Sequence, residues 1–278
     1  METKLNYKRT FLIGLAFLSI CSFWQMYDNI IPLILQNTYH LGETMTGAVM
    51  ALDNVLAIFL LPVFGALSDK VHTKLGRRMP FIVAGTILAV IFMMLLPMID
   101  NAEKARWNTG ESFSNQVIFL AVLFFTLVSM GLYRSPAVAL MPDVTPNHLR
   151  SRANAVINLM GAVGGVYALI MIKVLVGKGE TPDYLPLFAS IAAVMAIAVG
   201  ILVITIRENK LREEVEKAEA ANAGTIEEKA MAEGVEAAGE IEAVGDTGEI
   251  KSFDGKKQTG KTEGTKGMPK EVKRSMYF

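Results

Sequence analysis

Six long apolar runs constrain the fold of this chain more than any other feature. A helix needs about 20 mostly apolar residues to cross the roughly 30 Å hydrocarbon core of a bilayer. The six runs are Phe11–Leu35, Met45–Leu67, Phe81–Ile99, Gln116–Leu140, Ala153–Val176 and Leu185–Ile206. Because a segment in lipid must satisfy its own backbone hydrogen bonds, each run predicts a transmembrane helix and not a strand. The sequence therefore predicts an all-α integral membrane protein.

The charges of the chain are unevenly distributed along it. The 278 residues have a formal net charge of zero, but ionisable residues are sparse up to Ile206 and frequent from Arg207 to Phe278. The second part holds few large apolar residues that could be buried. We therefore predict a six-helix bundle over residues 1–206 and a mostly disordered charged linker over 207–278. A helix that extends the sixth span to about Ala220 is also expected.

Lysine and arginine indicate the orientation of the bundle. Twelve of these residues flank the spans at the end that holds the N-terminus, against three in the loops at the opposite end. Loops rich in Lys and Arg stay in the cytoplasm. We expect both termini to be cytoplasmic and the protein to lie in the plasma membrane.

The sequence argues against catalysis and metal binding. Its only cysteine, Cys21, lies in an apolar run, so a disulfide framework and a cysteine metal site are excluded. His40, His72 and His148 fall in loops without a second ligand at metal spacing. An enzyme within the membrane would need a nucleophile–base pair or a metal cluster, and no motif of either kind is present. We expect no cofactor, no metal and no nucleic-acid partner.

Polar residues gather on four of the six predicted helices. The third and sixth spans carry no ionisable residue, whereas the first, second, fourth and fifth carry acids, amides and Arg134. A charge in the middle of a bilayer costs a few kcal/mol unless it faces water or a partner. We therefore expect the four polar helices to surround an aqueous cavity and the other two to face lipid. This alternation suggests that helices 1–3 and 4–6 are repeats of one another.

Two carboxylates, Asp28 and Asp53, are the candidates for coupling to a proton or cation. Asp28 lies about 25 Å along the first helix, and Asp53 enters the second helix from the same membrane surface, so the two have similar depths. Like charges in a desolvated site can share one proton. The alternative is a structural pair in which Lys173 or Arg134 neutralises one member.

Aromatic and amide side chains near Asp28 are typical of a sugar site. An indole face suits the apolar face of a sugar ring, and amide or hydroxyl groups suit its polar rim. Packing between helices is the alternative role for each of them. The candidate substrate-binding residues are Trp24, Gln25, Tyr27, Asn54, Asn154 and Asn158.

Further residues have expected roles in helix packing. Arg134 is expected to form an ion pair with Asp69 or Asp143, with a position facing the cavity as the alternative. A cluster of small residues in the fifth run is expected to allow close helix packing. It consists of Gly161, Gly164 and Gly165.

The connection between the second and third runs has a recognisable pattern. It places four cations beside Asp69, with Gly65 before them to allow close helix approach and Gly76 to allow a turn. This stretch resembles the helix 2–3 signature of the major facilitator superfamily. Its end, RRMPFI, is most similar to the plant sucrose transporters and related animal sugar carriers, and more loosely to the glycoside–pentoside–hexuronide carriers. A second similar patch begins with Pro136, Ala139, Leu140 and Asp143, and continues through Ala153-Asn154-Ala155.

The resemblance implies a carrier of two six-helix bundles that works by alternating access. This chain would supply the first bundle and its linker would lead toward a second bundle that the chain lacks. The resemblance also implies a conformational latch that braces the cytoplasmic helix ends against the second bundle, formed by Gly65, Asp69, Gly76, Arg77 and Arg78. The expected function is secondary active transport of a sugar or oligosaccharide coupled to a proton or cation. The alternatives are a drug or metabolite efflux carrier of the same superfamily and a truncated half-carrier without activity of its own.

Overall fold

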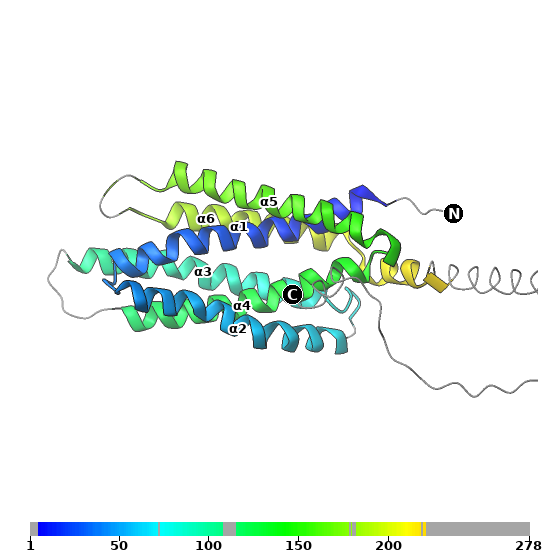
Figure 1. Cartoon of the computed structure of the whole chain (residues 1–278), viewed down its shortest axis with the longest axis horizontal. Coiled ribbons are helices and arrows are strands. Elements are labelled where there is room, and N and C mark those ends of the chain that lie inside the picture. Colours follow the sequence, from blue (N-terminus) through cyan, green and yellow to red (C-terminus); the bar gives the residue numbers. More distant parts are fainter. Residues whose placement is uncertain are drawn as a thin grey trace, which may run out of the picture. The chain divides into compact units, whose positions relative to one another are not determined.

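The structure is a computed structural model, and it confirms the predicted all-α fold (Figure 1). It describes residues 5–71, 73–107, 115–177, 179, 182–217 and 219–220. The elements are α1 (Tyr7–Asn37), α2 (Glu43–Lys70), α3 (Met79–Trp107), α4 (Gln116–Asp143), the short 3₁₀ helix η1 (Asn147–Leu149), α5 (Arg150–Leu175) and α6 (Leu185–Thr205). Within the described residues, six helices are long and apolar enough to cross a membrane.

The helix packing repeats itself between the two halves of the bundle. Helix α1 of the first half packs on α5 and α6 of the second half, and α4 of the second half packs on α2 and α3 of the first. If α1, α2 and α3 are matched to α4, α5 and α6, the α1–α5 contact corresponds to α4–α2 and the α1–α6 contact to α4–α3. The α3–α6 contact corresponds to itself. This correspondence supports the predicted repeats of three helices. In this correspondence α3 and α6 occupy equivalent positions, as the absence of ionisable residues from both spans suggested.

Close approach of backbones determines how α1 packs against α5. A Cβ atom on Gly164 would overlap the backbone carbonyl of Leu18, and one on Gly161 would lie 2.9 Å from the sulfur of Cys21. The Ser22 hydroxyl donates a hydrogen bond of 2.9 Å to the carbonyl oxygen of Gly164. The predicted role of these glycines in helix packing is therefore confirmed at Gly161 and Gly164. Small residues at such positions are typical of helix contacts in membranes.

Helix α3 is longer than the apolar run that predicted it. It continues two turns past Ile99, so Lys104 and Arg106 lie in a helix and not in a loop as expected. This extension presents Asp100, which is fully buried, to the hydroxyl of Thr38 at 2.7 Å and the ammonium of Lys104 at 2.6 Å. Lys104 also donates to the carbonyl of Pro182 at 2.6 Å. The network joins α1, α3 and the α5–α6 connection at one end of the bundle.

A short helix over residues 208–217 follows α6. It was expected as a continuation of the sixth span, but the extended backbone of Ile206 separates the two helices. Leu211 and Val215, only 8% and 9% exposed, pack this helix on the end of the bundle. The first part of the predicted linker is therefore ordered helix. The rest of that prediction, over residues 221–278, lies outside the described residues.

The α1–α5 contact predicts a loss of stability at one of two adjacent glycines and little effect at the other. Gly164→Ala should destabilise the bundle by about 1–3 kcal/mol, because the new methyl group overlaps the Leu18 carbonyl. Gly165→Ala is the matched control, since its Cβ would meet only Gln25 Oε1 at 3.7 Å, an ordinary contact. Thermal unfolding of both variants in detergent measures the difference. Equal unfolding temperatures would show that the backbones are not in close contact there.

Candidate functional site

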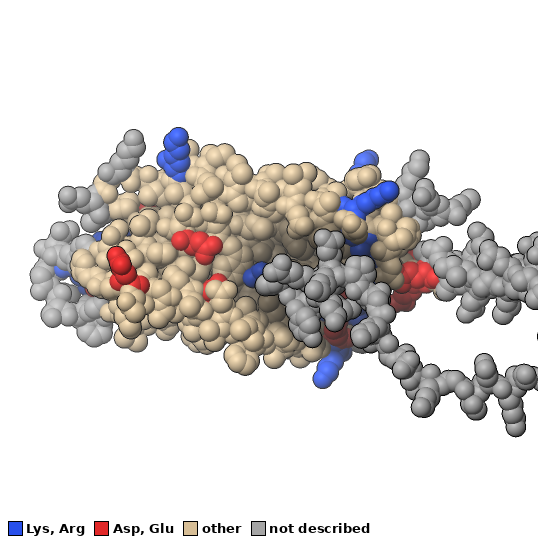
Figure 2. Space-filling view, in the orientation of Figure 1, with Lys and Arg blue, Asp and Glu red and all other residues tan. Residues whose placement is uncertain are grey.

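A groove between α1 and α5 gathers several of the predicted polar residues. It encloses about 430 Å³, and Trp24, Gln25 and Asp28 from α1 face Asn158 from α5 across it. Cys21 and Gly161 also line it. The groove combines an indole, two amides and a carboxylate, which is the chemistry expected for a sugar site. Figure 2 shows one face of the bundle, where a mostly neutral surface along the helices is interrupted by acidic and basic side chains.

A smaller recess lies on the other side of Trp24, between α1, α2 and α4. Asp53 from α2 and Arg134 from α4 line it together with Trp24. The guanidinium of Arg134 lies over the indole ring, 5.5 Å from its centroid, in a cation–π arrangement. Trp24 lines both this recess and the groove, so the two carboxylates predicted at similar depth lie in adjoining hollows that share one indole.

Three candidate residues lie differently from the expectation. Tyr27 is 1% exposed and stacks on Phe23, so it belongs to the core and not to the groove as predicted. Its hydroxyl has no hydrogen-bond partner among the described residues. Asn54 donates a hydrogen bond of 2.9 Å to Asp53, and Asn154 is exposed one turn before Asn158 on α5. Adjacent residues of a helix point in different directions, so Tyr27 is buried next to the exposed Asp28, which composition alone does not reveal.

The expected ion pair of Arg134 with Asp69 or Asp143 is wrong. Both acids pair with other arginines, and Arg134 lies over Trp24 instead. Arg134 and Asp143 are on the same helix about 13 Å apart along its axis, too far for a direct contact. The alternative position, facing the polar recess, is the observed one.

The predicted aqueous cavity differs in form from the observed recesses. Among the described residues, polar side chains of α1, α2, α4 and α5 line an open groove and a smaller recess. The apolar residues Ile58, Phe59 and Leu159 of α2 and α5 are exposed on either side, at 65–70%. The groove and the recess therefore lie on a largely apolar exposed surface of these helices.

A buried arginine organises the charged connection between α2 and α3. Arg78 is 5% exposed, and its guanidinium contacts Asp69 at 2.6 Å and Asp143 at 3.0 Å. The same guanidinium donates to the hydroxyl of Ser68 at 2.6 Å and to the carbonyl of Gly65 at 3.3 Å. Arg78 therefore joins the end of α2, the start of α3 and the end of α4.

The neighbouring Arg77 strengthens this cluster. It contacts Asp143 at 2.8 Å and lies 3.8 Å from Asp69. Partial burial acts to lower the pKa of Arg77, but its hydrogen bond to Asp143 and the surrounding carboxylates outweigh burial and raise the pKa above its usual value. Arg77 therefore stays charged. Asp143, which the sequence analysis expected to pair with Arg134, belongs to this cluster instead.

Glu208, which the sequence interpretation placed in the linker, completes the cluster. It is 1% exposed, and its carboxylate accepts hydrogen bonds of 3.0–3.1 Å from the backbone N–H groups of Arg77, Arg78 and Met79. These N–H groups belong to the first residue of α3 and to the two residues before it, at a helix start where N–H groups have no acceptor within the helix. A carboxylate at this position also complements the positive end of the helix dipole. The signal in the sequence was an acid directly after the sixth apolar run.

The two predicted glycines have the expected geometry. Gly76 has a φ of 124°, a conformation that favours glycine, and a Cβ atom there would overlap the carboxylate of Glu208. A Cβ on Gly65 would lie 3.3 Å from the hydroxyl of Ser135 on α4, so α2 and α4 are close there. The turn and the close approach predicted at these positions are both present.

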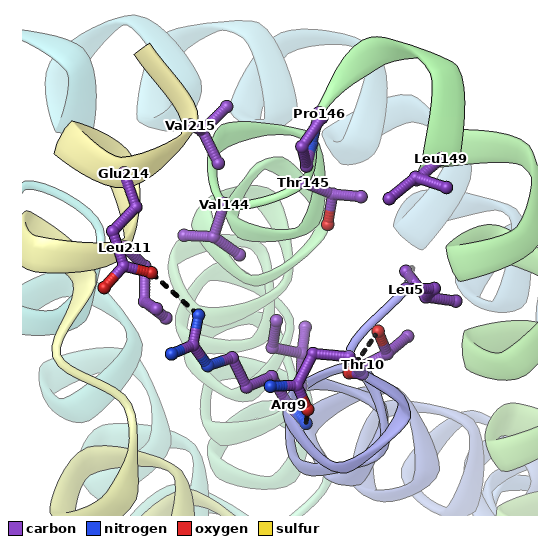
Figure 3. A pocket seen from close by; sticks show the side chains of 12 residues that line it. Leu5, Arg9, Thr10, Val144, Thr145, Pro146, Leu149, Leu211, Glu214 and Val215 are labelled. Atoms are coloured by element: carbon purple, nitrogen blue, oxygen red, sulfur yellow. Dashed lines mark hydrogen bonds and ion pairs between the residues drawn. The ribbon is translucent and has the colours of Figure 1, made fainter. Parts of the chain in front are cut away.

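A further pocket lies at the end of the bundle where α1 begins and α4 connects to α5 (Figure 3). It has a volume of about 190 Å³ between the start of α1, the α4–α5 connection and the 208–217 helix. Arg9 and Glu214 form an ion pair of 2.9 Å at its edge, and Leu211 and Val215 line its apolar part. The 208–217 helix is therefore bound through Glu208, through this ion pair and through apolar contacts. Among the described residues, no group of three or more potential ligands could hold a metal ion.

These features define a class of membrane protein: a bundle of two three-helix repeats with a polar groove and a charged network that links its helix ends. The chain belongs to the Major Facilitator Superfamily, whose family model matches residues 7–250. That family consists of membrane transporters, and its match agrees with the resemblance found in the sequence.

Individual relatives are sucrose transport proteins of plants. Sucrose transport protein SUC4 of Arabidopsis thaliana is 35% identical over 116 residues, which cover 39% of this chain and 22% of that protein. Sucrose transport protein SUT3 of Oryza sativa subsp. japonica is 26% identical over 137 residues, which cover 46% of this chain and 27% of that protein. The matched part of the chain thus spans about a quarter of the length of these relatives.

The burial of Glu208 predicts a large effect of its removal. Glu208→Ala should lower the free energy of unfolding by about 1–3 kcal/mol, because three buried N–H groups lose their acceptor. Glu214→Ala is the control, since its ion pair with Arg9 is exposed and such pairs contribute at most about 1 kcal/mol. Thermal unfolding combined with hydrogen exchange at residues 77–79 measures both. Unchanged exchange at these amides in Glu208→Ala would contradict the capping role.

Proposed function

We propose that the chain forms the first half of a secondary active transporter that moves a sugar or oligosaccharide by alternating access. The observation that carries this proposal is the groove in which Trp24 and Gln25 of α1 face Asn158 of α5. An indole stacks on the apolar face of a pyranose ring, while amides donate to and accept from its hydroxyl groups. The sucrose transport proteins among the relatives support the same class of substrate.

Asp28 and Asp53 are proposed as the site of coupling to a proton or another cation. Asp28 lies in the groove, and Asp53 lies in the adjoining recess with Arg134. A charge within a membrane-spanning helix is costly, so one that lines a substrate groove is a candidate for ion coupling. In this proposal a proton on one carboxylate relieves the repulsion between the two and favours sugar binding beside them.

The charged cluster is proposed as a conformational latch on the cytoplasmic side of the plasma membrane. Lys and Arg are concentrated at this end of the bundle, which favours both termini in the cytoplasm. Asp69 keeps 48% of its side chain exposed while it contacts Arg78. That exposed edge gives a second bundle a charged group to bind and release, whereas Asp143, whose side chain is only 16% exposed, holds Arg78 in place.

Sugar uptake tests the proposed function directly. The complete polypeptide encoded by the gene is reconstituted in vesicles and supplied with radiolabelled sucrose, with and without an inward proton gradient. We expect saturable uptake that the gradient increases. The absence of saturable uptake of sucrose and of other oligosaccharides would refute sugar transport and favour the efflux alternative.

The coupling residues make a separate prediction in the same assay. Asp28→Asn and Asp53→Asn should each leave protein in the membrane but lower gradient-driven uptake about tenfold or more, because the amide cannot bind the coupling proton. Exchange of sugar without a gradient should be less affected. Asp183→Asn is the matched control and should transport normally, because this acid lies in the α5–α6 connection and lines neither the groove nor the recess. Normal gradient-driven uptake by both aspartate variants would remove the coupling proposal and leave sugar transport standing.

Cys21 provides a reporter of groove occupancy, because it is the only cysteine of the chain and lines the groove. We expect saturating sucrose to slow its modification by a methanethiosulfonate reagent at least threefold, since bound sugar covers the thiol. The control is Ile204→Cys in a Cys21→Ser background, because Ile204 is 84% exposed on α6, away from the groove. Equal modification rates with and without sugar at Cys21 would place the sugar elsewhere.

A further inference from the structure

An apolar groove runs between α3 and α6, apart from the polar groove described above. It has a volume of about 410 Å³, and its lining includes Val83, Ile87, Val90, Val199, Gly200 and Ile204. No ionisable residue lines it. These positions belong to the first turns of α3 and the last turns of α6, so the groove extends to the end of the bundle that holds the charged cluster.

Exposed cations lie just beyond this end of the groove. Arg207 follows α6 by two residues, and Lys210 begins the next turn; both are exposed. The side-chain amide of Asn209 donates to the carbonyls of Thr73 and Lys74 at 3.0 and 3.3 Å, which brings the segment of Arg207 and Lys210 beside the start of α3. Lys74 is exposed there as well. Among the described residues, Lys74, Arg207 and Lys210 have no ion-pair partner.

The acids nearby do not neutralise these three cations. Glu208 is buried and its carboxylate is occupied by backbone N–H groups. Asp69 contacts Arg78, and further along the 208–217 helix Glu213 pairs with Lys217 and Glu216 with Arg212. The edge of the groove therefore keeps a local excess of positive charge.

We propose that this groove binds one anionic phospholipid, with an acyl chain between α3 and α6 and its phosphate beside Arg207, Lys210 and Lys74. Lipid tails are as apolar as the residues of the groove, so the groove alone cannot select one lipid over another. Selection comes from the cations, which attract anionic headgroups at the membrane surface. The groove fixes where the chain of that lipid lies. The anionic cytoplasmic leaflet supplies such lipids on the side proposed for this end.

Charge removal tests the headgroup part of the site. The complete polypeptide is purified from a mixture of phosphatidylglycerol and phosphatidylcholine, and retained lipid is measured by native mass spectrometry. Arg207→Gln/Lys210→Gln should lose phosphatidylglycerol preference about tenfold or more, because each cation at an anionic surface contributes roughly fivefold. The control Lys8→Gln/Arg152→Gln removes two exposed cations from α1 and α5 at the same end. An equal loss in both double variants would overturn the proposal in favour of non-specific attraction.

A second pair of variants tests the acyl-chain part. Gly200→Leu fills the groove without a clash, because a Cβ there meets no atom within 4 Å, and it should reduce the number of retained phosphatidylglycerol molecules. Gly47→Leu is the matched control, since Gly47 on α2 also has no atom within 4 Å of its Cβ. Adding inorganic phosphate should not displace the lipid. Unchanged retention in Gly200→Leu, or displacement by phosphate, would show that no lipid chain occupies the groove.

Discussion

The guanidinium of Arg78 is the interaction on which the charged end of this bundle depends. A buried cation is stable only if its partners satisfy both its charge and its N–H groups. Arg78 achieves this through Asp69 and Asp143 together with neutral acceptors at the end of α2. Because these partners come from α2 and α4, satisfying one side chain fixes three helix ends relative to one another.

Glu208 extends this constraint to a fourth element. Its carboxylate binds the backbone of the residues that carry the two arginines, so the start of α3 is held from the 208–217 helix as well as from α2 and α4. The opposite end of the bundle has its own buried acid, Asp100, which links α1 and α3 to the α5–α6 connection. Contacts therefore tie the helices together at both ends, and the glycine contact holds α1 close to α5 in the middle. The alternating access proposed above would require such a connected unit.

The sequence predicted the elements well and the polar contacts poorly, for a physical reason. A transmembrane helix is determined by the length and apolarity of its own segment, so the six runs matched α1–α6 closely. Partners across the bundle depend on which turn of each helix meets which neighbour. Arg134 was therefore expected beside Asp143 but lies over Trp24, and Tyr27 is buried although Asp28, the next residue, is exposed.

Glu208 illustrates a different limit of sequence interpretation. Its surroundings are highly charged, and composition placed it in a linker with no packed role. What makes it buried is a set of backbone N–H groups at the start of α3, and backbone donors leave no trace in residue composition. The open groove with Trp24 and Asp28 presents the complementary case, because the buried indole N–H of Trp24 has no hydrogen-bond partner among the described residues. Polar groups that a rigid membrane bundle leaves exposed between apolar surfaces need water, substrate or another protein surface to satisfy them, and a carrier supplies all three in turn.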